Sequence, residues 1–472
     1  MVQVTSRHLN ALGRHVALIG FMGAGKTTLG RDAAMRLGRE FVDLDRVIEE
    51  RSGKTIPQLF EERGEAGFRD LERHAAEMAF SSPGPLVVAL GGGAISTPET
   101  RALVEAVFVV LVEIDPDTAW ERVRRNDRRP LARDEHAFRR LYAEREPVYR
   151  ATADAVATDT AGVVLAAGGV HHERGALDRL GELVPGNGPV ALVADTTVMG
   201  IYGARAQEAL AGRLSSVHEL PAGEEAKTVA VVQRLWRELR LDRGGTVVAL
   251  GGGCTTDVAG FAAATYLRGV PWVSVPTTLV GQVDAAIGGK TGIDIPEGKN
   301  LVGAFHWPAR VVLDESLLET LPERERRQGM SELVKTRLLA GRNLDVRGAA
   351  AYKAGICLQD PHDHGPRRWL NLGHTFAHGL EAAADYDLPH GEAVALGLLA
   401  ALRLSGRDTA EVERELQPQP AHVDPERAWQ ALLRDKKRTG DAINLVLLGP
   451  DGPYVEPRPA DEVRRELERL IA

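Results

Sequence analysis

The densest group of side chains that could do chemistry lies between Asn371 and Glu392. Three of the chain's 14 histidines, His374, His378 and His390, fall in this stretch. His374 and His378 are four residues apart and would share one face of a helix. Three imidazoles, or two with a carboxylate, suit zinc. Spacing alone pairs His374 with His378 in a metal or substrate site; the alternative is a helical hairpin with surface and capping histidines.

A second group surrounds a glycine-rich loop near the N-terminus. An apolar run at positions 16–19 predicts a strand, which leads into GFMGAGKT and a helical pattern from Thr28 to Leu37. This is the GxxxxGK[ST] motif with a strand before it and a helix after it, which predicts a phosphate-binding loop. Lys26 would reach the β/γ-phosphates and Thr27 would hold Mg²⁺. The backbone N–H groups that wrap the phosphates belong to Gly23, Ala24, Gly25, Lys26, Thr27 and Thr28.

Acidic and basic groups follow that loop at regular intervals. Asp43 and Asp45 have strand spacing near a strand end, so one could serve Mg²⁺ or act as a base and the other could bind a hydroxyl-rich substrate. Singly, each later arginine is more often a solvated surface charge. Together they could clamp a small anionic acceptor; the set is Arg69, the glycines 91–93, Arg128, Arg129 and Arg145.

Across residues 14–160, the segments FMGAGKTTLGRDAAMRLG, FVDLD, GEAGFRDLE, GGGAI, RRPL and AEREPVY resemble shikimate kinase in order and spacing. The resemblance implies that Asp43 serves Mg²⁺ through water and that Asp45 is the general base. Arg129 would lie in a lid near the adenine or the phosphates. The implied shikimate site contains Asp45, Gly92 and Gly93, with Arg69 and Arg145 gripping the carboxylate through their guanidinium forks. After Asp159 we expect no long closing helix.

Strands and helices alternate from about 161 to 308, which predicts a parallel, Rossmann-like α/β sheet. One strand ends at Asp195, which is suitably placed for a ribose hydroxyl. Another leads into Gly251–Gly253 and Asp257, where residues without side chains would let a pyrophosphate approach backbone N–H groups. A third block contains Asp284, Lys290, Lys299 and Asn300. It is either a solvated glycine loop or a site for a phosphorylated polyol.

The stretch LNLGHTFAHGLE…HGEAVALG resembles the zinc-binding core of 3-dehydroquinate synthase. The resemblance implies that His374 and His390 bind the metal with Glu332, from the stretch GMSELVK, while His378 faces the substrate. Three protein ligands leave an open position, as in catalytic sites. Ligand type does not distinguish zinc from cobalt.

The same resemblance implies two further groups of residues. An NAD site would contain Asp195, Glu224, Lys227, Gly251, Gly252, Gly253, Asp257, Thr277 and Thr278. A heptulosonate phosphate site would contain Asp284, Lys290, Lys299, Asn300, Lys335, Lys353, Arg367, Asn371, His378 and either Lys436 or Lys437. The catalytic groups of the whole chain would be Lys26, Asp45, Arg129, Asp284, Lys290 and His378. Apolar periodicity predicts that residues 309–472 are mainly helical.

The chain therefore reads as a tail at 1–13, a kinase at 14–160, and a synthase with an α/β part at 161–308 and a helical part at 309–472. The implied reactions are ATP-dependent phosphorylation of shikimate, and conversion of 3-deoxy-D-arabino-heptulosonate 7-phosphate to 3-dehydroquinate with NAD⁺ returned unchanged. The alternatives are another sugar-phosphate cyclase or a polyol dehydrogenase of similar fold, or a scaffold built from decayed enzymes.

Bulk composition limits the other classes of function. The net charge of −8 gives no reason to expect nucleic acid or membrane binding. No apolar run approaches the length of a transmembrane span. Two cysteines cannot form a disulfide framework, which fits the cytoplasm. The synthase family is often dimeric, so a homodimer through the second part is an expectation.

Overall fold

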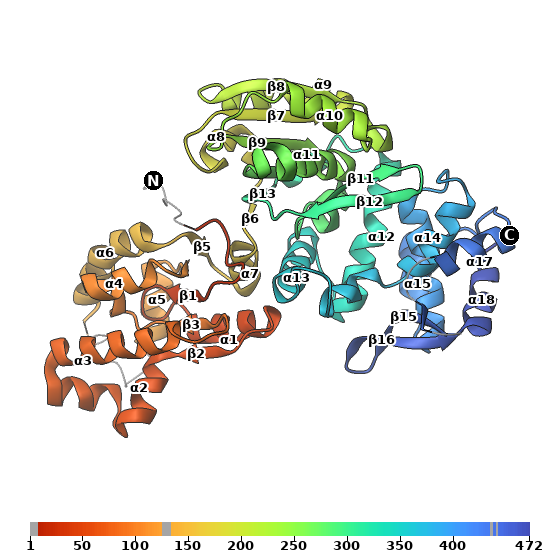
Figure 1. Ribbon diagram of the computed structural model, residues 1–472. Helices are drawn as coiled ribbons and strands as arrows, with labels where there is room; N and C mark the ends of the chain where they lie inside the picture. Colours follow the sequence, from red (N-terminus) through yellow and green to blue (C-terminus); the bar gives the residue numbers. More distant parts are fainter. Residues whose placement is uncertain (1–7, 125–133, 435–437, 440–441) are drawn as a thin grey trace. The chain divides into compact units, whose positions relative to one another are not determined.

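The computed structural model describes residues 8–124, 134–434, 438–439 and 442–472. It divides into two compact units (Figure 1). Unit 1 comprises residues 1–171 together with 354–359, and unit 2 comprises 172–353 and 360–472. Arg129, Lys436 and Lys437 lie outside the described residues.

Unit 1 is built on a five-stranded sheet in the order β2-β3-β1-β4-β5. Its neighbouring strands pair in parallel. The central strands consist of apolar residues buried on both faces, which is typical of a parallel sheet covered by helices. The strands are β1 Val16–Ile19, β2 Phe41–Asp43, β3 Val87–Ala89, β4 Phe108–Val112 and β5 Ala155–Ala157.

The helices of unit 1 include one that the sequence reading missed. We expected no long helix to close this segment, and the helix found there is short: Asp159 caps an eight-residue helix, α7, that packs on α1. Six of its eight residues are buried, so its sequence lacks the alternation of apolar and polar residues that marks an amphipathic helix. In the sequence alone it cannot be told from a buried strand. The helices are α1 Lys26–Arg36, α2 Leu44–Ser52, α3 Ile56–Phe80, η1 Ala94–Ser96, α4 Pro98–Val104, α5 Pro116–Val123, α6 Glu135–Thr152 and α7 Thr160–Ala167.

Unit 2 begins with a six-stranded sheet in the order β6-β13-β10-β9-β7-β8. In this sheet the neighbouring strands β13, β10, β9, β7 and β8 all pair in parallel, which confirms the predicted Rossmann-like α/β class. The strands are β6 Val170–His172, β7 Val190–Asp195, β8 Leu214–Leu220, β9 Thr246–Gly251, β10 Trp272–Pro276 and β13 Arg310–Leu313. The helical pieces around them are η3 Ala176–Arg179, α8 Leu180–Leu183, α9 Thr196–Leu210, η4 Gly223–Ala226, α10 Val229–Glu238, α11 Gly253–Thr265 and η5 Tyr266–Arg268.

Helices dominate the rest of unit 2, as predicted, but this region also contains a three-stranded sheet that we did not predict. Between the two regions lie η6 Gly281–Ala285 and an antiparallel hairpin of β11 Lys290–Ile295 and β12 Gly298–Phe305. The helices are η7 Glu315–Leu318, α12 Glu323–Ala340, α13 Val346–Gln359, η8 Pro366–Asn371, α14 His374–Ala383, α15 His390–Leu404, α16 Ala410–Leu416, α17 Pro425–Arg434 and α18 Ala460–Glu468. The last six residues of α13 belong to unit 1. The sheet contains β14 Arg438–Thr439, β15 Ala442–Gly449 and β16 Gly452–Pro459.

Among the described residues, no helix has both the length and the apolar character needed to cross a membrane.

Candidate active sites

A cluster of three metal-ligating side chains lies where three helices of unit 2 meet. Glu332 comes from the middle of α12, whereas His374 and His390 are the first residues of α14 and α15. One ligand atom from each lies within 4.8 Å of the others. The structure therefore assembles the set that the family resemblance implied. His378, which spacing alone would have chosen, is exposed, and its ring lies beside that of His374 with 5.6 Å between centroids.

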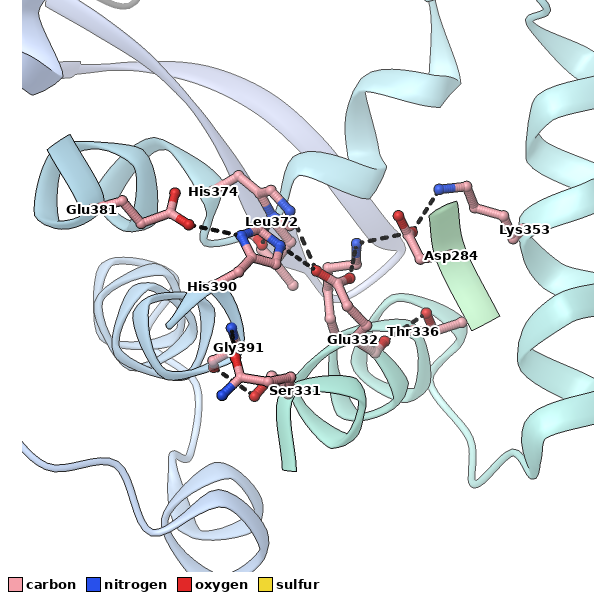
Figure 2. Close-up of polar contacts among 12 residues, drawn as sticks. Asp284, Ser331, Glu332, Thr336, Lys353, Leu372, His374, Glu381, His390 and Gly391 are labelled. Atoms are coloured by element: carbon pink, nitrogen blue, oxygen red, sulfur yellow. Dashed lines mark hydrogen bonds and ion pairs between the residues drawn. The ribbon is translucent and has the colours of Figure 1, made fainter. Parts of the chain in front are cut away.

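The hydrogen bonds of the two histidines direct one ring nitrogen of each toward Glu332 (Figure 2). The Nδ1 atoms lie 3.2 Å from the carbonyl oxygen of Leu372 for His374, and 2.9 Å from Glu381 Oε1 for His390. Both Nε2 atoms approach Glu332 Oε1, at 3.4 and 3.2 Å respectively. Two imidazole lone pairs and a carboxylate oxygen repel one another at this range unless a cation or proton lies among them. The residues present therefore fit a divalent metal.

The surroundings affect the two histidines in opposite directions. Burial and the nearby Lys335 ammonium lower the pKa of His374 to about 4, which leaves the ring neutral, as a metal requires. Burial also disfavours the charged form of His390, but its hydrogen bonds to Glu332 and Glu381 raise its pKa to about 10. Metal binding at this site would therefore displace a proton from His390.

Glu381 gives a testable prediction because it holds His390 from outside the ligand set. Glu381→Gln is expected to lower zinc affinity by about 10- to 100-fold, since carboxylates of this kind fix the ring and raise its basicity. Affinity can be measured by competition with a chromophoric chelator. Glu392→Gln is the matched control, because this exposed glutamate lies two residues after His390 on the same helix. Equal affinities in the two variants would contradict the role of Glu381.

A chain of alternating charges extends from the metal cluster. Lys335 is 1% exposed and lies between Glu332 and Asp284, whose Oδ1 is 3.4 Å from its Nζ. The same Asp284 oxygen accepts a hydrogen bond from Lys353 Nζ at 2.5 Å (Figure 2). Asp284 thus holds two buried ammonium groups beside the metal position. An anionic substrate could use these cations, because desolvated charges interact strongly with phosphate and carboxylate.

Lys290 has a partner that the sequence reading missed. Its Nζ donates to Asp363 Oδ2 at 2.5 Å. Asp363 has a φ of 64°, which is uncommon for a residue with a side chain. Arg367, predicted to bind the substrate phosphate, is 2% exposed and donates to the carbonyls of Gly288 at 2.8 Å and Pro361 at 2.9 Å. Arg367 therefore also fixes the loop that carries Lys290. Asn371, the remaining predicted contact, is half-buried at the end of η8.

The predicted cofactor loop lies at the start of α11, after β9. Gly252 precedes the helix, and a Cβ there would lie 3.1 Å from Thr278. The Thr277 N–H donates to the Gly251 carbonyl at 3.0 Å, so the two predicted segments are adjacent. Asp195 is buried; it caps α9 and accepts from Thr255 Oγ1 at 3.0 Å. Both oxygens of Asp195 are therefore already engaged within the fold.

Lys299 and Asn300, two residues predicted to bind the heptulosonate phosphate, lie beside predicted cofactor residues. Lys227 Nζ donates to Asp257 Oδ2 at 2.9 Å and also contacts the side chain of Asn300. Lys299 Nζ lies 3.4 Å from Glu224 Oε1. The strand β12 carries both residues to that side, away from the Lys290–Asp363 pair. The motif could not show this, because Asn300 has a φ of 55° and so departs from the alternation of a regular strand.

The phosphate-binding loop of unit 1 has the arrangement that its motif predicts. Lys26 Nζ donates to the carbonyls of Gly20 at 2.7 Å and Phe21 at 3.2 Å, so its ammonium lies over the loop. Thr27 Oγ1 donates to Asp43 Oδ2 at 2.6 Å. The two predicted Mg²⁺ groups are thus adjacent.

The predicted shikimate residues converge on the glycine run after β3. Arg145 Nη1 donates to the Gly92 carbonyl at 3.0 Å, and the Tyr149 hydroxyl donates to the same oxygen. A Cβ on Gly93 would lie 2.2 Å from Arg69 Nη2, so the guanidinium rests against this backbone. On Gly91, a Cβ would approach Asp45 Oδ1 at 2.8 Å and Glu72 Oε1 at 2.1 Å. Tyr149 and Glu72 were not predicted. The one sequence signal is helical spacing, which places each of them on the same helix face as a predicted arginine, Arg145 or Arg69.

Glu72 gives a prediction about pH and stability. It is 1% exposed, and burial raises its pKa to about 7 although Arg69 favours the ionised form. The folded chain therefore binds this proton more tightly than the unfolded chain, in which the pKa is near 4.5. As pH rises from about 4.5 to about 7, this group should lower the free energy of unfolding by on the order of 3 kcal/mol.

The measurement compares unfolding of unit 1 in the wild type and Glu72→Gln at several pH values. The variant has no carboxyl to titrate, so its stability relative to the wild type should increase between pH 5 and 7. A difference that stays constant with pH would contradict the raised pKa.

Comparison with known proteins finds family models for both parts of the chain. A shikimate kinase family model matches residues 22–167. Models for the N-terminal and C-terminal parts of 3-dehydroquinate synthase match residues 217–328 and 310–438. The fold and the sites define an ATP-dependent kinase joined to a metal-dependent enzyme of the sugar-phosphate cyclase type.

Individual relatives narrow this class. The "Bifunctional shikimate kinase/3-dehydroquinate synthase" of Thermotoga maritima is 31% identical over 484 residues, covering 93% of this chain and 96% of the relative. The 3-dehydroquinate synthase of Symbiobacterium thermophilum is 40% identical over 345 residues, covering 63% and 96%. A solved 2-epi-5-epi-valiolone synthase from Streptomyces hygroscopicus subsp. jinggangensis 5008, with NAD⁺ and Zn²⁺ bound, has a TM-score of 0.54 at 27% identity and covers 64% and 96%. This chain belongs to the bifunctional shikimate kinase/3-dehydroquinate synthase family.

Proposed function

We propose that unit 1 phosphorylates shikimate with ATP and Mg²⁺ through the residues gathered around the phosphate-binding loop. Lys26 and the loop N–H groups would neutralise and position the phosphates, and Thr27 and Asp43 would hold Mg²⁺. Asp45, at the glycine run, would accept the proton of the attacking hydroxyl. Phosphoryl transfer depends mainly on positioning and charge neutralisation, and these groups supply both.

Substrate recognition in unit 1 would rest on its two inward-facing arginines. Arg69 and Arg145 lie against Gly93 and Gly92, so a small ring bound on the glycine backbone could place a carboxylate between them. Guanidinium groups bind carboxylates in two-point fashion, which fixes orientation as well as charge. Arg129 is proposed as a lid residue over the nucleotide, from the sequence motif alone.

We propose that unit 2 converts 3-deoxy-D-arabino-heptulosonate 7-phosphate to 3-dehydroquinate and phosphate. Glu332, His374 and His390 would hold zinc or cobalt, and the glycine run before α11, with Lys227 and Asp257, would hold NAD⁺. When bound, NAD⁺ would take and return a hydride and the metal would polarise oxygen atoms of the substrate. The chain's own contribution is to bind, orient and shield the substrate.

The cations of unit 2 would hold the two anionic groups of that substrate. Lys335 and Lys353 are paired with Asp284, and Lys290 is paired with Asp363. The phosphate and carboxylate of the substrate would replace these aspartates as partners of the lysines. His378 is exposed beside the metal cluster and is proposed to exchange protons with the substrate. Asn371 and Arg367 complete the proposed site, together with either Lys436 or Lys437, which are proposed from the sequence motif alone.

The convergence of Glu332, His374 and His390 from three helices carries the synthase proposal. The test is phosphate release from the heptulosonate phosphate by the purified chain, with and without NAD⁺, and after chelation with zinc added back. Release that needs both, without net NADH, is the expected result. Net NADH from a polyol, or release from a different sugar phosphate only, would overturn this assignment.

We also propose that the chain forms a homodimer through unit 2 and acts in the cytoplasm on small molecules, without nucleic acid or membrane partners. Its two cysteines, Cys254 and Cys357, form no disulfide in the described part of the chain, which suits a reducing compartment. Light scattering on the full chain measures the oligomeric state; a monomer at micromolar concentration would contradict the dimer.

A further inference from the structure

The guanidinium group of Arg69 has three kinds of surroundings at its three nitrogens. Nη1 pairs with Glu72, a carboxylate that is almost fully buried. Nη2 donates to Glu65 Oε1 at 3.0 Å, and the Glu65 side chain is 67% exposed. Nε is buried and, among the described residues, has no hydrogen-bond partner. The centroids of the Phe60 and Phe68 rings lie 5.8 and 5.7 Å from Arg69 Cζ.

These three environments distinguish the two edges of the arginine fork. The edge formed by Nη1 and Nη2 is occupied at one end by the buried Glu72, whose release would leave a buried charge unpaired. The edge formed by Nε and Nη2 carries one unpaired donor and one donor held by an exposed side chain. Buried unpaired N–H groups are rare and call for an explanation. A planar carboxylate matches two parallel donors of this kind.

We infer that the Nε–Nη2 edge of Arg69 is where the carboxylate of the acceptor docks, and that Glu65 occupies this edge until the acceptor displaces it. The inference rests on the proposed shikimate kinase function of unit 1. Glu72 keeps Nη1 throughout and so holds the guanidinium in its orientation. Glu65 thereby acts as an internal competitor that sets the affinity for acidic acceptors, and it takes no part in phosphoryl transfer.

The displacement is feasible because the two glutamates differ in exposure. Only the Glu65 side of this pair is well solvated, since its side chain is 67% exposed and that of Arg69 is 12% exposed. A released Glu65 carboxylate would return to water, so breaking the pair costs little once the acceptor carboxylate takes its place on Arg69. Glu65 also follows Gly64, whose φ of 68° interrupts α3, so the segment that carries it departs from regular helix. By contrast Glu72 is 1% exposed and lies against the glycine run.

The test measures steady-state kinetics of shikimate phosphorylation by the full chain carrying Glu65→Gln. The variant keeps the shape of the side chain and removes its charge, so KM for shikimate should fall by about two- to fivefold while kcat stays unchanged. Asp70→Asn is the matched control: it removes an exposed charge from the next turn of the same helix, where Asp70 pairs with Arg73 and not with Arg69. Its KM should stay near the wild-type value.

A second readout separates displacement from a structural effect. Shikimate methyl ester lacks the carboxylate, so its weaker binding should be the same in the wild type and Glu65→Gln. A KM for shikimate that is unchanged or higher in Glu65→Gln would overturn the inference, as would an equal decrease in Asp70→Asn. No phosphorylation of shikimate by the wild type would overturn the proposed kinase function itself, and the inference with it.

Discussion

His390→Ala is expected to purify without bound zinc and to release no phosphate from the heptulosonate phosphate, while its shikimate kinase activity stays within about twofold of the wild type. His390 would supply one of the three proposed ligand atoms that cluster among the described residues, and its Nε2 lies 3.2 Å from Glu332 Oε1. Losing a direct ligand should cost more than the roughly 10- to 100-fold associated with supporting groups. Metal content by mass spectrometry and the two activity assays measure the result on one preparation.

His378→Ala is the matched control for that experiment. His378 lies beside the metal cluster but is not a member of it, so this variant should keep its zinc and lose activity only through the substrate. Zinc retained by His390→Ala, or lost from His378→Ala, would show that the pair suggested by helical spacing holds the metal instead.

Lys26→Ala is expected to lower kcat for shikimate phosphorylation by about 10²- to 10³-fold and to leave phosphate release by the synthase unchanged. The Lys26 ammonium lies over the phosphate-binding loop, 2.7 Å from the Gly20 carbonyl, where it can neutralise the transferred group. Removing one preorganised group that stabilises transition-state charge has effects of this size. Coupled assays with ATP and shikimate, and separately with the heptulosonate phosphate and NAD⁺, measure the two activities.

Lys54→Ala controls for loss of a lysine elsewhere in unit 1, because Lys54 pairs with Glu62 on the surface and lies far from the loop in sequence. It should retain both activities. Loss of both activities in Lys26→Ala would contradict independent sites and indicate that the substitution damages the fold or couples the units.

The sequence predicts those features that depend on short, contiguous stretches of chain. The phosphate-binding loop is predicted together with its strand and helix, because glycines, lysine and threonine must occur there in fixed order. The metal site shows the limit of such reasoning. Helical spacing selects His378, whereas the residue that the structure brings to the two other candidate ligands is Glu332, which lies on another helix and is placed there by packing of α12 against α15.

Features that depend on packing between distant segments could not be predicted. Glu72 and Tyr149 are placed against the glycine run by α3 and α6, and Asp363 reaches Lys290 from a loop far along the chain. The helix α7 has no polar face, so the sequence shows no helical periodicity of apolar and polar residues there. Lys299 and Asn300 fall beside the cofactor residues, since the hairpin that carries them sets their direction.

Each of the two units has its own sheet and its own site, yet both are translated as one polypeptide. A cell that makes this chain therefore produces the two catalysts in equal numbers, whatever the strength of transcription or the stability of the messenger RNA. Flux through either step can then be adjusted only by catalytic rate and substrate level, and not by relative abundance. A change in gene dosage would scale both capacities together.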